Sequence, residues 1–172
     1  GKTSTMTHRI AYMIEEQGIN PYNILAVTFT NKAAKEMRTR VEDLLGANVN
    51  MWILTFHSAC LRILRSHAAV LGYSTDFTVY DPTDQKTLIK SIMKELNLDS
   101  KHFPVNMFLA NISSCKEQKL SPEGFLHAYG SDYKNDKIYQ VYKRYNQELM
   151  SNNAMDFDDL LWNAVKVFER DE

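Results

Sequence analysis

The chain has 172 residues, which is enough for one compact domain or one and a half small ones. Hydrophobic residues make up 44% and charged residues 24%, as in an ordinary soluble globular protein, and no apolar run approaches the roughly 18 residues that a membrane span needs. The net charge of −1 argues against a highly basic nucleic-acid-binding protein, but residues 1–68 carry eight Lys/Arg against five Asp/Glu, so we expect any anionic partner to meet the N-terminal part.

The two cysteines, Cys60 and Cys115, lie far apart in the sequence and lack the spacing of metal ligands. Both fall in apolar helical patterns, so we expect buried thiols in a reducing compartment. These features predict a cytoplasmic protein that has no contact with a membrane.

The first four residues, Gly1, Lys2, Thr3 and Ser4, have the sequence of the last part of a phosphate-binding loop. In such a loop backbone N–H groups cradle the phosphates, while a Lys and a hydroxyl reach the β/γ-phosphates and Mg²⁺. Three common residues also recur by chance, so G-K-T alone is equally compatible with an ordinary polar N-terminus. Apolar residues at the spacing of one helix face predict a helix over residues 4–16.

Two short apolar runs follow, at residues 24–29 and 51–55. Their nearly continuous apolar character predicts strands that are buried on both faces, as in a parallel sheet. A helix is expected over residues 31–45, another from about residue 57 to residue 71, and a third, shorter strand over residues 77–80. This alternation implies parallel βαβ units, which bind ligands at the carboxyl ends of their strands.

From Asp81 onward no further strand is predicted. Asp81 is a typical helix N-cap because Pro82 follows at the first helical position and Asp84 stands near the positive end of the helix dipole. Further helices are expected at residues 105–115, after Ser121, at residues 132–150 and after Asp156. Residues 81–152 thus have the pattern of a separate all-helical unit.

Residues 26–37, with the sequence A-V-T-F-T-N-K-A-A-K-E-M, resemble motif Ia of the UvrD/Rep/PcrA-type superfamily 1 DNA helicases. Residues 55–58 (T-F-H-S) resemble motif Ib, and residues 155–161 (M-D-F-D-D-L-L) resemble the segment that follows the helical 1B insertion of that family. With G-K-T at the start and D-P-T-D-Q at residues 81–85, the resemblance covers essentially the whole chain. Several ordered motifs at compatible spacing are far more specific than any one of them.

The resemblance implies an α/β fold, namely a parallel-sheet phosphate-loop (RecA-like) domain that is incomplete here and carries an all-helical inserted subdomain. Residues 1–80 and 153–172 would form part of the ATPase domain 1A, and residues 81–152 would form domain 1B. The parent protein would be an ATP-dependent 3′→5′ DNA helicase that translocates on single-stranded DNA and unwinds duplexes in repair or replication.

Several parts of such a motor are not found in these residues, including the front half of the phosphate loop, the Walker B strand and domain 2. Asp171 and Glu172 do not form a Walker B motif, because a predicted helix rather than an apolar strand precedes them. We therefore expect the chain alone to have no helicase activity and little or no ATPase activity, with no catalytic residue among its 172.

For the ATP site, the resemblance implies contacts from Gly1, Lys2, Thr3 and Ser4. Lys2 would pair with the β/γ-phosphates, and Thr3 would coordinate Mg²⁺. Ser4 stands where close relatives often have Arg, so one contact on the nucleotide side is in doubt.

For the DNA site, the resemblance implies contacts to single-stranded DNA from seven residues: Thr28, Phe29, Thr30, Asn31, Thr55, His57 and Phe157. Phe29 would contact an unstacked base, since stacking on a π-face tolerates any sequence; alternatively it is a core residue that caps the sheet. His57 would bind the phosphate backbone, or else it only begins a helix. Phe157 would stack on a base, or else it is buried under the helical unit.

Other polar groups have structural interpretations that we favour. Asp156 and Asp159 fit the N-cap and third position of a helix, where they satisfy backbone N–H groups, better than they fit a metal site. Arg62 and Arg65 lie opposite an apolar helix stripe, which usually means solvated surface rather than a DNA contact. Tyr142, with Tyr145, fits a core stripe.

Three alternatives remain. The chain could belong to a helicase–nuclease subunit of the RecB/AddA type, although its helical unit is compact. It could be a phosphate-loop kinase of small metabolites, or a non-enzymatic DNA-binding module. The expected partners are single-stranded and duplex DNA, and the sequence identifies no protein partner.

Overall fold

The computed structural model describes residues 1–170. Asp171 and Glu172 therefore lie outside the described residues. They are the pair rejected above as a Walker B motif, and they end the predicted domain 1A. The elements, in chain order, are α1 (Lys2–Glu15), η1 (Pro21–Asn23), β1 (Leu25–Thr28), α2 (Asn31–Leu45), β2 (Trp52–Thr55), α3 (Phe56–His67), η2 (Ala68–Leu71), β3 (Thr78–Tyr80), α4 (Pro82–Glu95), α5 (Val105–Glu117), α6 (Pro122–Tyr129), α7 (Tyr133–Ser151), β4 (Ala154–Asp156) and α8 (Phe157–Arg170). No helix among the described residues is long and apolar enough to cross a membrane.

Two compact units make up the chain, Gly1–Arg62 and Ile63–Glu172. We call them unit 1 and unit 2 and describe each by itself. This division does not test the domain bounds expected from the sequence, which stay a prediction.

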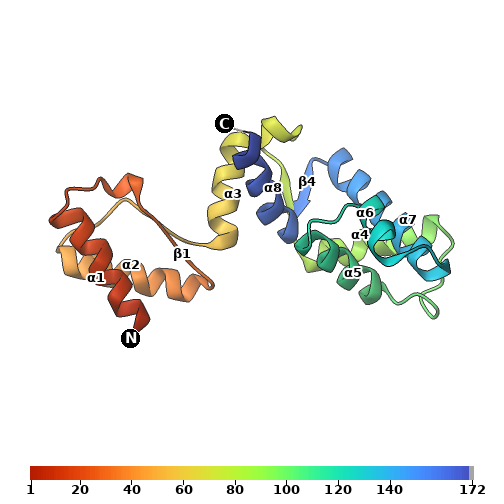
Figure 1. The fold of residues 1–172 in the computed structure, drawn as a ribbon, viewed down its shortest axis with the longest axis horizontal. Coiled ribbons are helices and arrows are strands. Elements are labelled where there is room, and N and C mark those ends of the chain that lie inside the picture. The colour runs from red at the N-terminus through yellow and green to blue at the C-terminus, as the bar shows by residue number, and fades with distance from the viewer. Residues whose placement is uncertain (171–172) are drawn as a thin grey trace. The chain divides into compact units, whose positions relative to one another are not determined.

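Unit 1 is built on the parallel pair β1 and β2, in which Leu25 lies opposite Trp52 and Thr28 lies opposite Thr55. Helices α1 and α2 pack on each other, and α2 packs on both strands (red and orange in Figure 1). The core consists of apolar side chains from both helices, both strands and the segments before the strands: Ile10, Ile24, Ala26, Ala34, Met37, Val41, Val49, Met51 and Ile53.

The burial of the first two strands differs from the prediction. Ala26 and Ile53 are buried on one face, whereas Leu25 on the other face is 52% exposed and Trp52 is only half-buried. The expectation of strands buried on both faces was therefore wrong for the described residues. A continuous apolar run shows that both faces are apolar, but it does not show that both are covered.

Unit 2 contains a second parallel pair, β3 and β4, in which Val79 lies opposite Met155. The sequence predicted β3 but not β4. All three β4 residues are buried. Three residues are too few to show the alternation of apolar and polar side chains that indicates a strand in a sequence. Helices α4, α5, α6 and α7 supply most of the core (green to blue in Figure 1), whose buried side chains include Tyr142, Tyr145, Phe108, Phe125, Ile89 and Ile138. The prediction that Tyr142 and Tyr145 are core residues is confirmed.

Helix caps confirm most of the expected helix starts. Asp81 and Asp84 form a reciprocal capping box at α4, and the side chains of Ser121 and Asp132 accept backbone N–H groups at α6 and α7. Helix α2 ends at Gly46, which has the left-handed conformation (φ 64°) that glycine adopts without strain. Small parallel sheets with helices place the described residues in the α/β class.

Candidate nucleic-acid interface

The carboxyl ends of β1 and β2 bring together most of the residues that the sequence assigned to DNA. Because the strands are parallel neighbours and Thr28 lies opposite Thr55, the segments that follow them leave the same edge of the sheet. Each segment leads directly into a helix, α2 after β1 and α3 after β2. Neither helix has an acidic residue in its first turn, so nothing there offsets the positive end of its dipole.

Phe29 lies at this edge with 90% of its side chain exposed. The alternative in which it caps the sheet as a core residue is therefore excluded. Its ring centroid is 5.4 Å from that of Phe56, and the two rings are tilted by 45°. Phe56 is itself 41% exposed, so the edge carries two adjacent aromatic rings that are open to solvent. The sequence analysis did not single out Phe56, although its position directly after the second strand was an available signal.

The polar residues around Phe29 shape the turn between β1 and α2. Thr28 is nearly buried, and its hydroxyl donates a hydrogen bond of 3.0 Å to the carbonyl of Thr30. The Thr30 hydroxyl accepts the N–H of Ala33 at 3.1 Å and thereby caps α2. Asn31 is exposed at the first position of that helix. Thr30 and Asn31 thus remain open to a ligand, whereas the hydroxyl of Thr28 is occupied within the turn.

The second turn, between β2 and α3, repeats this chemistry. The Thr55 hydroxyl donates to the hydroxyl of Ser58 at 2.9 Å and accepts the N–H of Ser58 at 3.2 Å, as in a helix N-cap. His57 is exposed at the second position of α3. Thr55 is nearly buried, so at this turn the imidazole is the exposed polar group.

The two arginines of α3 have structural partners. The guanidinium of Arg62 lies 4.4 Å from the centroid of the Trp52 ring in unit 1. Arg65 lies 4.0 Å above the ring of Phe77 and donates to the carbonyls of Thr75 and Phe77 in unit 2. Arg65 is exposed, as expected for this helix face, and these contacts give it a structural role as well.

The predicted nucleotide residues form the start of α1. Gly1 is the N-cap, and no side chain caps this end of the helix. Lys2 and Thr3 are exposed, and Ser4 is half-buried, with its carbonyl accepting hydrogen bonds from Thr7 and His8. An uncapped helix N-terminus with an exposed Lys and an exposed hydroxyl fits a phosphate group and Mg²⁺.

Phe157, the remaining predicted DNA residue, belongs to unit 2. It is the first residue of α8 and is 42% exposed, which excludes full burial under the helical unit. It lies between the two residues of a reciprocal cap: Asp159 N–H donates to Asp156 Oδ1 (2.8 Å), and Asp156 N–H donates to Asp159 Oδ2 (3.1 Å). The capping role predicted for these two aspartates is confirmed.

The partner of this cap, Lys116, was not predicted from the sequence. Lys116, near the end of α5, is 3% exposed, and its Nζ lies 2.7 Å from Asp156 Oδ2 and 2.8 Å from Asp159 Oδ1. The hydroxyl of Tyr145 also donates to Asp156 Oδ2, at 2.8 Å. A lysine in a helix normally indicates a solvated face, and no local pattern tells that this one is buried.

Burial and charge shift the pKa values of this network in different directions. Burial opposes the ammonium of Lys116, but the two carboxylates outweigh that effect, so its pKa is raised. Burial would also raise the pKa of Asp156, but Lys116 outweighs it, so that pKa is lowered. Burial raises the pKa of Asp159 to about 6, and the charge of Asp156 adds to the shift. One lysine thus faces two buried carboxyl groups, of which Asp159 takes up a proton first.

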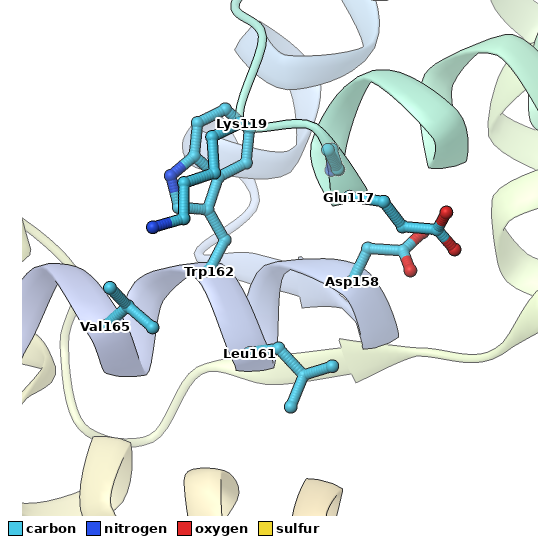
Figure 2. A pocket seen from close by; sticks show the side chains of 7 residues that line it. Glu117, Lys119, Asp158, Leu161, Trp162 and Val165 are labelled. Carbon is cyan, nitrogen blue, oxygen red and sulfur yellow. The ribbon is translucent and has the colours of Figure 1, made fainter.

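A pocket of about 240 Å³ lies between the end of α5 and α8. Glu117 and Asp158 lie close together at one end, and Lys119, Leu161, Trp162 and Val165 line the rest of the pocket (Figure 2). None of these residues was predicted to bind a ligand.

Of the two free cysteines, Cys115 is buried as expected, whereas Cys60 is only partly buried.

Unit 1 thus combines an exposed aromatic pair beside the starts of α2 and α3 with the sequence G-K-T at the start of α1. A model of the UvrD/REP helicase N-terminal domain matches residues 1–172. The chain is 48% identical to the ATP-dependent DNA helicase PcrA of Staphylococcus epidermidis over 171 residues, which are 99% of the chain and 23% of that protein. It is 46% identical to PcrA of Staphylococcus aureus, with the same coverage.

The chain therefore belongs to the UvrD/REP helicase family and corresponds to its N-terminal domain. It spans about a quarter of the length of these relatives.

Proposed function

We propose that this chain is part of an ATP-dependent DNA helicase and that the carboxyl ends of β1 and β2 contribute its contacts to single-stranded DNA. The observation that carries the proposal is the exposed ring pair of Phe29 and Phe56 at that edge. Base–aromatic stacking grips a strand without regard to sequence, and both rings lie beside polar helix starts.

Phosphate contacts would come from exposed polar residues at the two turns. Thr30 and Asn31 stand at the start of α2, and His57 stands at the start of α3. Helix N-termini and polar side chains commonly hold phosphates and fix the register of the strand. Thr28 and Thr55 would act by shaping these turns, because their hydroxyls are already hydrogen-bonded. Phe157 would add a further stacking contact.

At the start of α1, Lys2 would neutralise the β/γ-phosphates of ATP, and Thr3 would offer its hydroxyl to Mg²⁺, next to the backbone of Gly1 and Ser4. When bound, ATP with Mg²⁺ supplies the free energy for movement along DNA. These residues would bind and orient the phosphates, and the catalytic groups would come from other parts of the parent protein.

The family match supports a helicase of this type rather than a phosphate-loop kinase, and full-length relatives that are named PcrA do not favour the helicase–nuclease alternative. We also propose 3′→5′ translocation, unwinding of duplex DNA in repair or replication, action in the cytoplasm, and the 1A/1B assignment of residues 1–80 and 153–172 against 81–152. These proposals rest on the family resemblance.

The DNA contact can be tested by fluorescence anisotropy with a labelled oligo-dT at low salt. We expect weak binding that falls as salt rises and that weakens about tenfold in Phe29→Ala, within the range of base–aromatic stacking. Tyr22→Ala is the matched control. It removes another exposed ring, 65% exposed, that precedes β1 at the opposite end of the same strand. No binding, or equal losses in both variants, would contradict the proposed DNA contact.

A further inference from the structure

The buried network of Lys116, Asp156 and Asp159 joins two segments that are far apart in the sequence. Lys116 belongs to α5, whereas Asp156, forty residues later, ends β4 and caps α8, and Asp159 lies in the first turn of α8. Each carboxylate uses one oxygen for the reciprocal cap and the other for the ammonium of Lys116. The lysine therefore holds both halves of the cap at once, from a different helix.

Phe157 and Asp158 are the two residues that lie inside this arrangement. Phe157 follows Asp156 directly and lies inside the cap, so its backbone direction depends on the hydrogen bonds between Asp156 and Asp159. An isolated capping box fixes a helix start only by local contacts, and a free helix end frays easily. A buried ammonium bound to both carboxylates prevents that fraying.

The charges of the network argue for a role beyond stability. A buried lysine with two buried carboxyl groups is an expensive way to hold a helix, because well-packed apolar side chains often stabilise as much or more. Hydrogen-bonded charged groups instead fix the orientation of the two segments that they join, since each hydrogen bond has a required geometry. The helix start that they hold carries Phe157, whose side chain is 42% exposed.

We propose that Lys116 is a positioning residue for single-stranded DNA binding: it clamps the cap of α8 and thereby sets the ring of Phe157 for stacking on a base. This inference rests on the proposed function, in which Phe157 contacts DNA. It also couples the helices that the sequence assigned to domain 1B to the segment that it assigned to domain 1A.

The test combines Lys116→Met with Asp159→Asn. This double variant keeps the formal charge of the network and an amide oxygen that can still accept the N–H of Asp156, but it removes the clamp from α5. The single variant Lys116→Met leaves two buried carboxylates without a positively charged partner, so we expect it to unfold part of unit 2. Its folding, compared with that of the double variant, is the second measurement. Lys119→Met is the control for the loss of one positive charge at an exposed position after α5.

Binding is measured by anisotropy with an oligo-dT that contains one 2-aminopurine, whose fluorescence reports stacking on a ring. Phe157→Ala and the Lys116→Met/Asp159→Asn variant should each bind about fivefold to tenfold more weakly and should each lose 2-aminopurine quenching. Combining all three substitutions should weaken binding no further than Phe157→Ala does, because both changes act on the same contact. Lys119→Met should bind like the unmodified chain.

If the double variant is folded by circular dichroism and keeps full affinity and quenching, the positioning role is overturned. The same holds if its loss adds to that of Phe157→Ala, or if Phe157→Ala has no effect. If both Lys116 variants unfold, the network serves folding alone and the proposal is also overturned. Failure of the proposed function looks different, because binding by the unmodified chain would then be absent or independent of Phe29.

Discussion

The rings of Phe29 and Phe56 lie 5.4 Å apart and are tilted by 45°, although they come from segments that follow different strands. Each ring limits the positions that the other can take in solvent, so a base that stacks on Phe29 meets a ring that is already partly ordered. This reduces the conformational entropy lost on binding.

Phe56→Ala should therefore weaken oligo-dT binding by about twofold to fivefold, which is less than the loss in Phe29→Ala, since stacking on one ring remains possible. Anisotropy titrations at one low salt concentration measure this effect. The loss in the double variant should be smaller than the two separate losses combined, because the residues are in contact. Strictly additive losses would show that Phe56 does not support Phe29.

Arg65→Met should destabilise unit 2 without changing the affinity for DNA. The substitution removes two hydrogen bonds to backbone carbonyls and the contact with the ring of Phe77, whose side chain is 1% exposed. We expect a loss of roughly 1–2 kcal/mol in the free energy of unfolding.

Urea denaturation can isolate unit 2 through its tryptophan. In a Trp52→Phe background Trp162 is the only tryptophan that remains, since the chain has two. Arg65→Lys serves as a control that keeps the charge but not the fork of donors. If Arg65→Met lowers the affinity for DNA while Arg65→Lys binds DNA like the unmodified chain, the arginine acts on DNA through its charge instead.

The sequence predicted the local structure of this chain well, because local signals determine it. Asp81, Ser121 and Asp132 are caps whose chemistry is complete within a few residues, and the helices begin where they predict. The proposed DNA contacts at the ends of β1 and β2 were predicted from the order of the motifs, and Phe29, the central residue of that prediction, is 90% exposed.

Contacts between distant segments could not be predicted in the same way. The burial of Lys116 depends on two aspartates forty residues away, and Arg65 depends on the path of the backbone at Thr75 and Phe77. Such partners carry no local period or spacing. The exposure of Leu25 was missed for a related reason, because an apolar side chain does not reveal what covers it.

Thr30→Asp separates the two roles of Thr30. Aspartate is as good an N-cap as threonine or better, so the stability of α2 should be unchanged or slightly higher. The added negative charge at the proposed phosphate contact should weaken oligo-dT binding, by about tenfold at low salt and by less as salt screens it. Thr30→Ser, which keeps both the cap and the neutral hydroxyl, should bind normally. Equal affinities of Thr30→Asp and Thr30→Ser would remove Thr30 from the DNA contact.

The pKa of Asp159 predicts how the stability of unit 2 depends on pH. Its folded value of about 6 is above the value of roughly 4 for an unfolded aspartate, so the folded state binds more protons between these pH values. The contribution of Asp159 is therefore fully present below about pH 4 and is lost as the pH rises through 6. We expect the free energy of unfolding to be roughly 1 kcal/mol higher at pH 5 than at pH 7.5 on this account.

Asp159→Asn should abolish that difference, because the amide does not titrate. Urea denaturation of both chains at both pH values is followed through Trp162 in the Trp52→Phe background. The comparison cancels every pH effect that the two chains share. The lowered pKa of Asp156 acts only at more acidic pH, where its contribution is lost as the pH falls. An equal pH dependence in both chains would mean that Asp159 is ionised throughout this range, and Lys116 would then face two full negative charges at pH 5 as well.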